Sequence, residues 1–181
     1  MSRLLDEISR DFAWTAANRW EPLAGKPLWR QLWICAGLTV KSRILAVVLF
    51  RLKRGLRRHH VPVLPAFCDR LSILGWNVCL GDHTEIGPGL YLPHGNVVVD
   101  GIVRIGARCV IAPWVTIGVN GSGDNVFIGT GAKVLGGIRV GNNVRIGAGA
   151  VVLSDVPDGA TVVGVPARVV KVAGQHPDRS G

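Results

Sequence analysis

The chain has 181 residues, 48% of them hydrophobic, which excludes a disordered chain and leaves room for one domain, with or without a helical appendage. Its formal net charge is +9, and its 24 glycines recur along the sequence, which indicates a repeat with many tight corners. The four cysteines form no CxxC pair, so we expect neither a zinc site nor a disulfide framework. Acidic residues stand at positions 6, 7 and 11, so we expect no signal peptide. Together these observations predict a cytoplasmic protein.

The first 75 residues are predicted to be helical. A first helix is indicated by apolar residues that recur every three to four positions: Leu4, Leu5, Ile8, Phe12 and Ala16. After Pro22 and Pro27, a second helical run is expected over about 28–59. Pro62 and Pro65 then end this run, and a short apolar stretch leads to Trp76.

A block of basic residues covers the second half of this region. Between Lys41 and Arg70 lie eight lysines and arginines, opposed only by Asp69. The block indicates an anionic partner such as a membrane surface, a phosphorylated ligand or nucleic acid, unless it is a solvated face. Because Lys41 and Arg43 interrupt the apolar run, it cannot supply the roughly 20 apolar residues of a spanning helix. Residues 41–60 can therefore be interpreted in two ways: the helix lies on the inner face of an anionic membrane, or it packs on its own domain or a sister subunit. Of the anionic partners named above, we do not expect nucleic acid.

From Leu80 onward the apolar pattern has a period of six. Twelve units begin with Ile, Val or Leu, and seven of them carry Gly in the second place. The pattern predicts a solenoid in which three units form a triangular coil and each first residue points inward. We expect the second-place glycines to supply the positive φ that a corner needs.

Two irregularities interrupt the period. The step from Leu92 to Val99 is seven residues, with the extra residue just after His94. The step from Ile117 to Ile128 is eleven residues. A regular solenoid is a scaffold, so we expect the chemistry at such breaks.

Four motifs extend this interpretation: IGPGLYLPHG (86–95), VTIG (115–118), IGTGAKVLGGIRVGNNVRIGAGAVV (128–152) and GVPARVVK (164–171). With them, residues 81–171, roughly half of the chain, resemble the hexapeptide-repeat acyltransferases, and within these the serine acetyltransferase branch, which includes O-acetyltransferases of sugars and polysaccharides. The resemblance implies a mainly β fold: a left-handed parallel β-helix over 76–171, after a helical region over 1–75 and before a flexible tail over 172–181. It also implies a homotrimer, or a dimer of trimers, with acetyl-CoA in the groove between neighbouring subunits.

The resemblance assigns the site residues. His94 occupies the position of the catalytic histidine, whose imidazole accepts the proton of an attacking hydroxyl; the alternative is a histidine on a surface loop. Backbone N–H groups at Gly118 and Val119 are candidates for stabilising the oxyanion. The residues expected to contact CoA are Thr130, Gly131, Ala148 and Gly149 along the pantetheine arm and Lys133, Arg168 and Lys171 at the phosphates. The geometry of the corners explains the four small residues equally well, and a solvated face explains the three cations equally well. No metal is expected.

Three departures from the serine acetyltransferase pattern concern the acceptor. The family has an Asp fifteen residues before the catalytic histidine, and Cys79 occupies that position here. The family also has an Asp directly before the histidine, and Pro93 occupies that position. The loop at about 119–124 carries no Arg-His pair. These departures favour a hydroxyl of a sugar, a glycan precursor or another small metabolite over free serine. Asp82 or Asp100 could replace the missing orienting carboxylate, and Asp82 is the stronger candidate.

Two other functions remain open at this point. One is serine O-acetylation that feeds cysteine synthesis. The other is a non-catalytic trimer that scaffolds a biosynthetic complex. A β-helical carbonic anhydrase is disfavoured, because three zinc-binding histidines are needed and only His83 and His94 lie on the coils.

Overall fold

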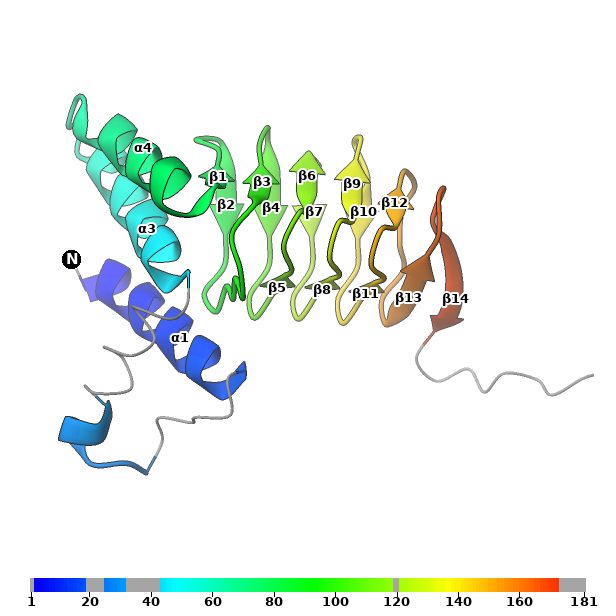
Figure 1. Ribbon diagram of the computed structural model, residues 1–181, viewed down its shortest axis with the longest axis horizontal. Helices are drawn as coiled ribbons and strands as arrows, with labels where there is room; N and C mark the ends of the chain where they lie inside the picture. Colours follow the sequence, from blue (N-terminus) through cyan, green and yellow to red (C-terminus); the bar gives the residue numbers. More distant parts are fainter. Residues whose placement is uncertain (1, 19–24, 32–42, 119–120, 173–181) are drawn as a thin grey trace, which may run out of the picture.

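The computed structural model describes residues 2–18, 25–31, 43–118 and 121–172 and shows a helical front on one end of a β-solenoid (Figure 1). The helices are α1 (Ser2–Asn18), α3 (Ile44–Arg58) and α4 (Leu64–Trp76). The strands, in chain order, are β1 (Val78–Leu80), β2 (Thr84–Ile86), β3 (Val97–Val99), β4 (Val103–Ile105), β5 (Val110–Ile111), β6 (Thr116–Gly118), β7 (Gly121–Ser122), β8 (Phe127–Ile128), β9 (Lys133–Leu135), β10 (Arg139–Val140), β11 (Arg145–Ile146), β12 (Val151–Val152), β13 (Ala160–Val163) and β14 (Arg168–Val172).

The helical front follows the sequence-based expectation with one difference. The first predicted helix is α1, and the second run is helical over 28–31 and in α3, while residues 32–42 lie outside the described part of the chain. Beyond Pro62, where a short apolar stretch was expected, the chain forms the helix α4. Pro65 does not break this helix because it lies in the first turn, where a missing N–H costs no intrahelical hydrogen bond.

The solenoid is a left-handed parallel β-helix of three sheets, which we call A, B and C. Sheet A has the order β1-β3-β6-β9-β12, sheet B the order β2-β4-β7-β10, and sheet C the order β5-β8-β11-β13-β14. The chain visits A, B and C in turn, so each circuit is one coil, and all strand pairs are parallel except β13 with β14. The segment expected as a reduced loop at 119–124 still contributes a strand, since 121–122 form β7 in sheet B.

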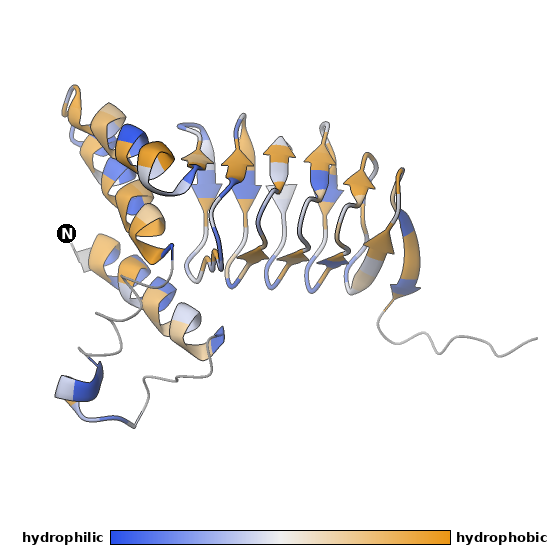
Figure 2. Ribbon diagram, viewed as in Figure 1, coloured by the Kyte–Doolittle hydropathy of each residue, from blue (hydrophilic) through white to orange (hydrophobic). Residues whose placement is uncertain are grey.

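The six-residue period is confirmed by the burial of the side chains. All twelve first-place residues are buried, from Leu80 to Val152, and they form one continuous core. Each such side chain contributes about 1.5–3 kcal/mol on leaving water. Figure 2 shows the strands of the solenoid predominantly in the colour of hydrophobic residues.

The second-place glycines have a different role from the predicted one. Their φ angles are not positive; the positive values occur two residues later at most corners, for example at Gly131 (73°) and Gly149 (67°). A Cβ added at Gly129 would lie 2.7 Å from the Ala148 nitrogen, and one at Gly87 would lie 2.8 Å from the Ala107 nitrogen. These glycines, apart from Gly118, where a Cβ would lie 3.8 Å from the Asp100 oxygen, are therefore needed because successive coils approach too closely for a side chain. The expected positive φ at these places is wrong.

The helical front closes the open end of the first coil through buried ionic groups. Carbonyls that point away from the second coil accept hydrogen bonds from α3: Lys53 Nζ donates to Leu80 O (2.6 Å), and the guanidinium of Arg51 donates to the carbonyls of Ile86 and Gly87. Asp11 of α1 accepts from the amides of Gly89 (2.7 Å) and Leu90 (3.0 Å) on the same coil. Polar backbone groups that would otherwise be buried without partners are thus satisfied.

Ion pairs connect the same groups to one another. Arg51 Nε lies 3.0 Å from Asp11 Oδ2, and both side chains are buried. Lys53 Nζ lies 2.6 Å from an oxygen of Asp69 on α4. Two cations of the predicted basic block are therefore interior residues and not part of a solvated face or an anion-binding surface.

The apolar residues of α3 also face inward. Ile44, Ala46, Val47 and Phe50 are buried and belong to the core of the solenoid. Two interpretations of residues 41–60 were open, and α3 follows the second: it packs on its own domain. Residues 41–42 lie outside the described chain. Among the described helices, none is long and apolar enough to cross a membrane.

Replacement of Arg51 by Met is expected to destabilise the protein by about 3–5 kcal/mol, because it leaves Asp11 charged and without its buried cation. Arg104→Met is the matched control, since Arg104 pairs with Glu85 at the surface (3.2 Å) and such pairs contribute about 1 kcal/mol or less. Urea unfolding followed by circular dichroism measures both. Equal losses in the two variants would contradict a structural role for the buried pair.

Gly129→Ala is expected to destabilise the solenoid by about 1–3 kcal/mol, as overpacking does, because the new Cβ would press on the next coil. Gly121→Ala is the control, since a Cβ there meets nothing within 4 Å and φ is not positive. Thermal unfolding should show a lower Tm only for Gly129→Ala. A lower Tm of the same size for Gly121→Ala would show that close coil contact is not the cause.

Candidate functional site

One edge of the solenoid gathers most of the predicted site residues. Each coil passes from sheet C to sheet A through a corner, and the stacked corners form what we call the C/A edge, made of residues 92–96, 112–115, 129–132 and 147–150. The turn 164–167 joins β13 to β14 within sheet C and ends this edge, because it hydrogen-bonds with Val151. Amides donate from coil to coil along the edge at Trp114 (2.7 Å), Gly131 (2.9 Å) and Gly149 (2.8 Å), and the amide of Asn96 donates to Trp76 at the end of α4 (3.2 Å).

His94 lies on the C/A edge, at the seven-residue step. The neighbouring Gly95 is buried, and a Cβ at this residue would collide with the carbonyl oxygen of Trp76 at the end of α4. Asn96 then takes a φ of 61° and donates its amide to the same carbonyl. The extra residue thus bends the chain against the helical front and leaves the imidazole of His94 exposed. Within the described chain no side chain hydrogen-bonds to this imidazole, so it can accept a proton from a molecule bound at the edge.

The four residues predicted along a pantetheine arm lie on the same edge. Thr130 and Gly131 belong to the corner before β9, and Ala148 and Gly149 to the corner before β12. Thr130, Ala148 and Gly149 are exposed, and three of the four side chains are a hydrogen or a methyl group. From β3, just after His94, to β12 there are three strand spacings, about 14 Å in total. The structure therefore brings His94 and these four residues together along one line.

The three predicted phosphate-binding cations are more widely spread. Lys133 of β9 lies beside the C/A edge, where its Nζ donates to Trp114 O (3.2 Å) and Thr116 Oγ1 (3.0 Å). Arg168 is exposed at the start of β14, directly after the turn that ends the edge. Lys171 is exposed three residues further along β14, where it pairs with Thr161. Lys133 and Arg168 thus lie near the edge, and Lys171 lies toward the opposite side of sheet C.

Two of the predicted residues lie on a different edge. Gly118 ends β6 and Asp82 follows β1, so both belong to the corners between sheets A and B, which we call the A/B edge. Strand β3, about 10 Å long, separates this edge from His94. Asp82 is also occupied there, because it pairs with Lys53 (3.2 Å) and with Arg57 of α3. Within one chain, the structure therefore does not bring Asp82 or Gly118 to His94. Val119 lies outside the described residues.

A groove that reaches Asn96, two residues after His94, escaped the sequence analysis. It has a volume of about 350 Å³ on the outer side of sheet A, next to the C/A edge and the end of α4. It is lined by Ile73, Asn77, Cys79, Asn96, Val98, Trp114, Val115, Thr116 and Lys133. The register of the strands explains this set, since Cys79, Val98, Thr116 and Lys133 are successive partners across β1, β3, β6 and β9.

Two of the groove residues have unusual properties. Trp114 is 62% exposed and takes a φ of 66°, which the corner requires at this place and which bulky residues rarely adopt. Cys79 stands where the resemblance expected a carboxylate, and burial together with the nearby Asp100 raises the pKa of its thiol. The thiol therefore stays neutral and cannot replace an anionic partner of a histidine. Among the described side chains, no three of His, Cys, Asp or Glu come together as a metal site.

Comparisons with known proteins agree with this geometry. The family model described as bacterial transferase hexapeptide (six repeats) matches residues 123–154. Serine acetyltransferase of Helicobacter pylori strain J99 is 34% identical over 165 residues, covering 86% of this chain and 88% of the relative. Serine acetyltransferase of Synechococcus elongatus is 40% identical over 143 residues, covering 74% of this chain and 59% of the relative. The crystal structure of Neisseria gonorrhoeae serine acetyltransferase in complex with serine matches with a TM-score of 0.78 and 26% identity, over 93% of this chain and 69% of that one.

The fold is a left-handed β-helix of the kind that hexapeptide repeats form, and the family model matches part of it. Within this class of fold, the chain belongs to the serine acetyltransferase family, as its match over most of the Helicobacter pylori relative shows. It spans about three fifths of the length of the Synechococcus elongatus relative and of a second cyanobacterial one, from Synechocystis (59% and 57%).

Proposed function

We propose that the protein is an acetyl-CoA-dependent O-acetyltransferase with His94 as general base. The observation that supports this most is the alignment of His94 with Thr130, Gly131, Ala148 and Gly149 along one exposed edge. In the reaction, the imidazole takes the proton of the acceptor hydroxyl while the oxygen attacks the thioester carbonyl. The C–S bond then breaks, the acetyl group stays on the oxygen, and the proton passes to the leaving thiolate of CoA.

The residues of the C/A edge fit CoA. Exposed glycines and alanines let the thin pantetheine arm approach the backbone, whose amides and carbonyls can hydrogen-bond to its amide groups. Arg168 at the end of the edge supplies a cation for the phosphates, and Lys133 and Lys171 are further candidates. CoA is the co-substrate in this proposal and supplies the acetyl group as a thioester.

The acceptor that the comparisons favour is free serine. The relatives that cover most of this chain are named serine acetyltransferases, and the similar Neisseria structure is described as a complex with serine. This support outweighs the sequence-based preference for a sugar or another metabolite, which depended on the departures at Cys79, Pro93 and the loop after Gly118. We therefore take serine O-acetylation as the first activity to test.

A sugar or glycan-precursor hydroxyl is the second candidate, and the groove that reaches Asn96 is the reason. Its wall carries the neutral thiol of Cys79 and the exposed indole of Trp114, together with Lys133. The aromatic face suits stacking against a sugar ring, whereas the lysine suits the carboxylate of an amino acid.

The site is proposed to be completed by a second copy of the chain. Gly118 and Asp82 lie on the A/B edge, too far from His94 of the same chain to act on the same substrate. In a homotrimer the A/B edge of one subunit can face the C/A edge of the next, so that a neighbour supplies the oxyanion donors. A dimer of such trimers is compatible with the same arrangement.

Activity is tested with the full chain, acetyl-CoA and L-serine, by following the release of the CoA thiol. His94→Ala is expected to lower kcat by about 10²–10⁴ without changing the Kd for CoA, because the base acts on the acceptor and not on CoA binding. His59→Ala, at an exposed histidine after α3 and away from both edges, is the control and should keep full activity. Turnover with a hexose but not with serine would favour the second acceptor. Full turnover by His94→Ala would overturn the mechanism, and an absence of CoA binding would favour a non-catalytic scaffold.

Ala148→Leu tests the proposed path of CoA. The larger side chain would occupy the exposed C/A edge, so the Kd for CoA should rise at least about tenfold, which corresponds to about 1.4 kcal/mol. Ala66→Leu is the matched control, because Ala66 is also exposed but lies on α4, away from both edges. Isothermal titration with CoA measures both variants. An unchanged Kd for Ala148→Leu would place the ligand elsewhere.

A further inference from the structure

Helix α4 leaves a stripe of large apolar side chains uncovered. Leu64, Phe67, Leu71 and Leu74 are 48%, 56%, 40% and 83% exposed. Their spacing of three, four and three residues places them on one face of the helix. Val63, just before the helix, is 82% exposed and lengthens the stripe, which we call the α4 stripe.

The opposite face of α4 is the one that packs on the protein. Pro65, Cys68 and Ser72 are buried, and α4 contacts α3 and β1. A helix at the surface of a domain normally buries its apolar side and exposes its polar side. Here a contiguous apolar surface faces outward at the end of the molecule, where Figure 2 shows α4 largely in the hydrophobic colour. Apolar surfaces of this kind mark places where a partner binds.

Basic side chains border the α4 stripe. Arg58, His59 and His60 are exposed at the end of α3, directly before the turn into α4. Arg70 is exposed on α4 and, by helical periodicity, lies beside Leu74 at the rim of the stripe. Asp69, the acidic residue of α4, has its charge matched by Lys53 Nζ at 2.6 Å. The surroundings of the stripe are therefore positive.

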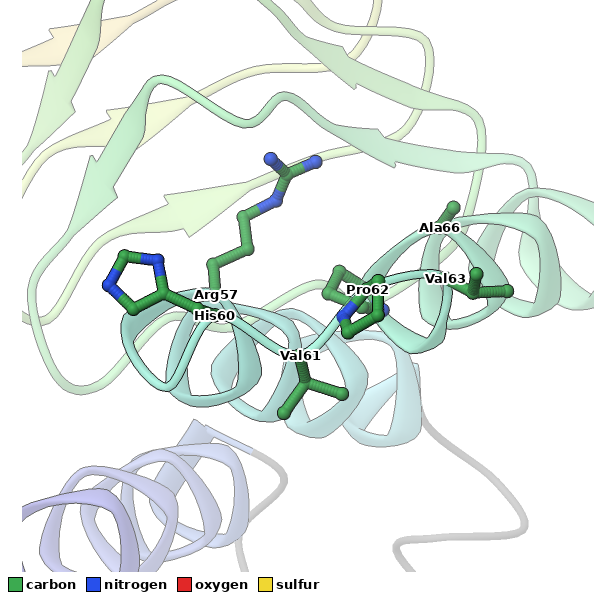
Figure 3. Close-up of a pocket in the computed structure, with 7 residues that line it drawn as sticks. Arg57, His60, Val61, Pro62, Val63 and Ala66 are labelled. Carbon is green, nitrogen blue, oxygen red and sulfur yellow. The ribbon is translucent and has the colours of Figure 1, made fainter.

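The turn between α3 and α4 brings the two kinds of side chain into contact. A hollow of about 320 Å³ is lined there by Arg57, His60, Val61, Pro62, Val63, Pro65 and Ala66. In Figure 3 the imidazole of His60 and the side chains of Val61 and Val63 extend from the same short connection. Polar and apolar side chains thus share the wall of one small hollow.

We propose that the α4 stripe and its basic rim are a docking surface for an anionic lipid bilayer. The leucines and Phe67 would enter the boundary between headgroups and acyl chains, while Arg58 and Arg70 would lie at the level of the lipid phosphates. This surface is separate from the C/A edge and independent of the proposed reaction. It also differs from the apolar face of α3, which the solenoid core buries.

Charge favours a bilayer over a second copy of the chain as the occupant. If two α4 stripes packed on each other, Arg58 and Arg70 of both copies would meet, and like charges would repel. The described acidic residues near the stripe cannot neutralise these arginines, because Asp69 is already paired with Lys53 and Asp82 with Arg57. A membrane that carries negative headgroups complements both the apolar and the basic part of the surface.

Co-sedimentation with vesicles tests the proposal on the full chain. We expect binding to vesicles of equimolar phosphatidylglycerol and phosphatidylcholine, and much weaker binding to phosphatidylcholine alone or at high salt. Phe67→Ser combined with Leu74→Ser should lower the partition coefficient at least about tenfold. Arg58→Gln and Arg70→Gln should each lower it about fivefold.

Ile102→Ser is the matched control, because Ile102 is 74% exposed on the solenoid, away from α4. This variant should bind vesicles as the wild type does. The proposal is overturned if the wild type does not bind anionic vesicles, if it binds neutral vesicles equally well, or if Ile102→Ser loses as much binding as the stripe variant. Sedimentation velocity without lipid adds a further outcome: self-association that the stripe variant abolishes would assign the stripe to a second copy of the chain.

Discussion

The contact between the helical front and the first coil is the interaction on which the rest of the molecule depends. A parallel solenoid pairs every coil with its neighbours, but the first coil has backbone carbonyls and amides with no coil beyond them. Arg51, Lys53 and Asp11 satisfy these groups with charged side chains that are themselves buried and paired. A buried ion pair stabilises a fold only when its remaining hydrogen bonds are also made, and here the open end of the solenoid supplies them.

The same contact positions the candidate catalytic residue. Because the front is held in place, the end of α4 lies under the corner that carries His94, and the carbonyl of Trp76 leaves room there only for Gly95. The side chain of His94 is therefore directed outward, onto the edge that also carries the small residues at 130–131 and 148–149. A rigid repeat that is interrupted at this corner thus exposes an imidazole on an edge of small side chains, which under the proposed function is the kind of preorganisation that acyl transfer requires.

The division of the predicted site between two edges has a chemical consequence. Within one chain, the C/A edge carries His94 and the small residues at 130–131 and 148–149, whereas Gly118 and the carboxylate of Asp82 lie on the other side of sheet A. A monomer therefore holds an incomplete site under the proposed mechanism, and assembly and activity would be coupled. The α4 stripe lies at the helical end of the solenoid, so docking there would leave the long edges accessible.

The sequence by itself determined the solenoid, its inward-facing residues and the place of His94, because a six-residue period and its interruption are local properties of the chain. Only the tertiary structure decided that Arg51 and Lys53 are interior cations and that most second-place glycines serve close coil contact. It also decided that Asp82 lies on a different edge from His94, and that 64–76 is a helix with an uncovered apolar face. Each of these depends on which atoms of distant segments meet, and a pattern along the chain does not contain that information.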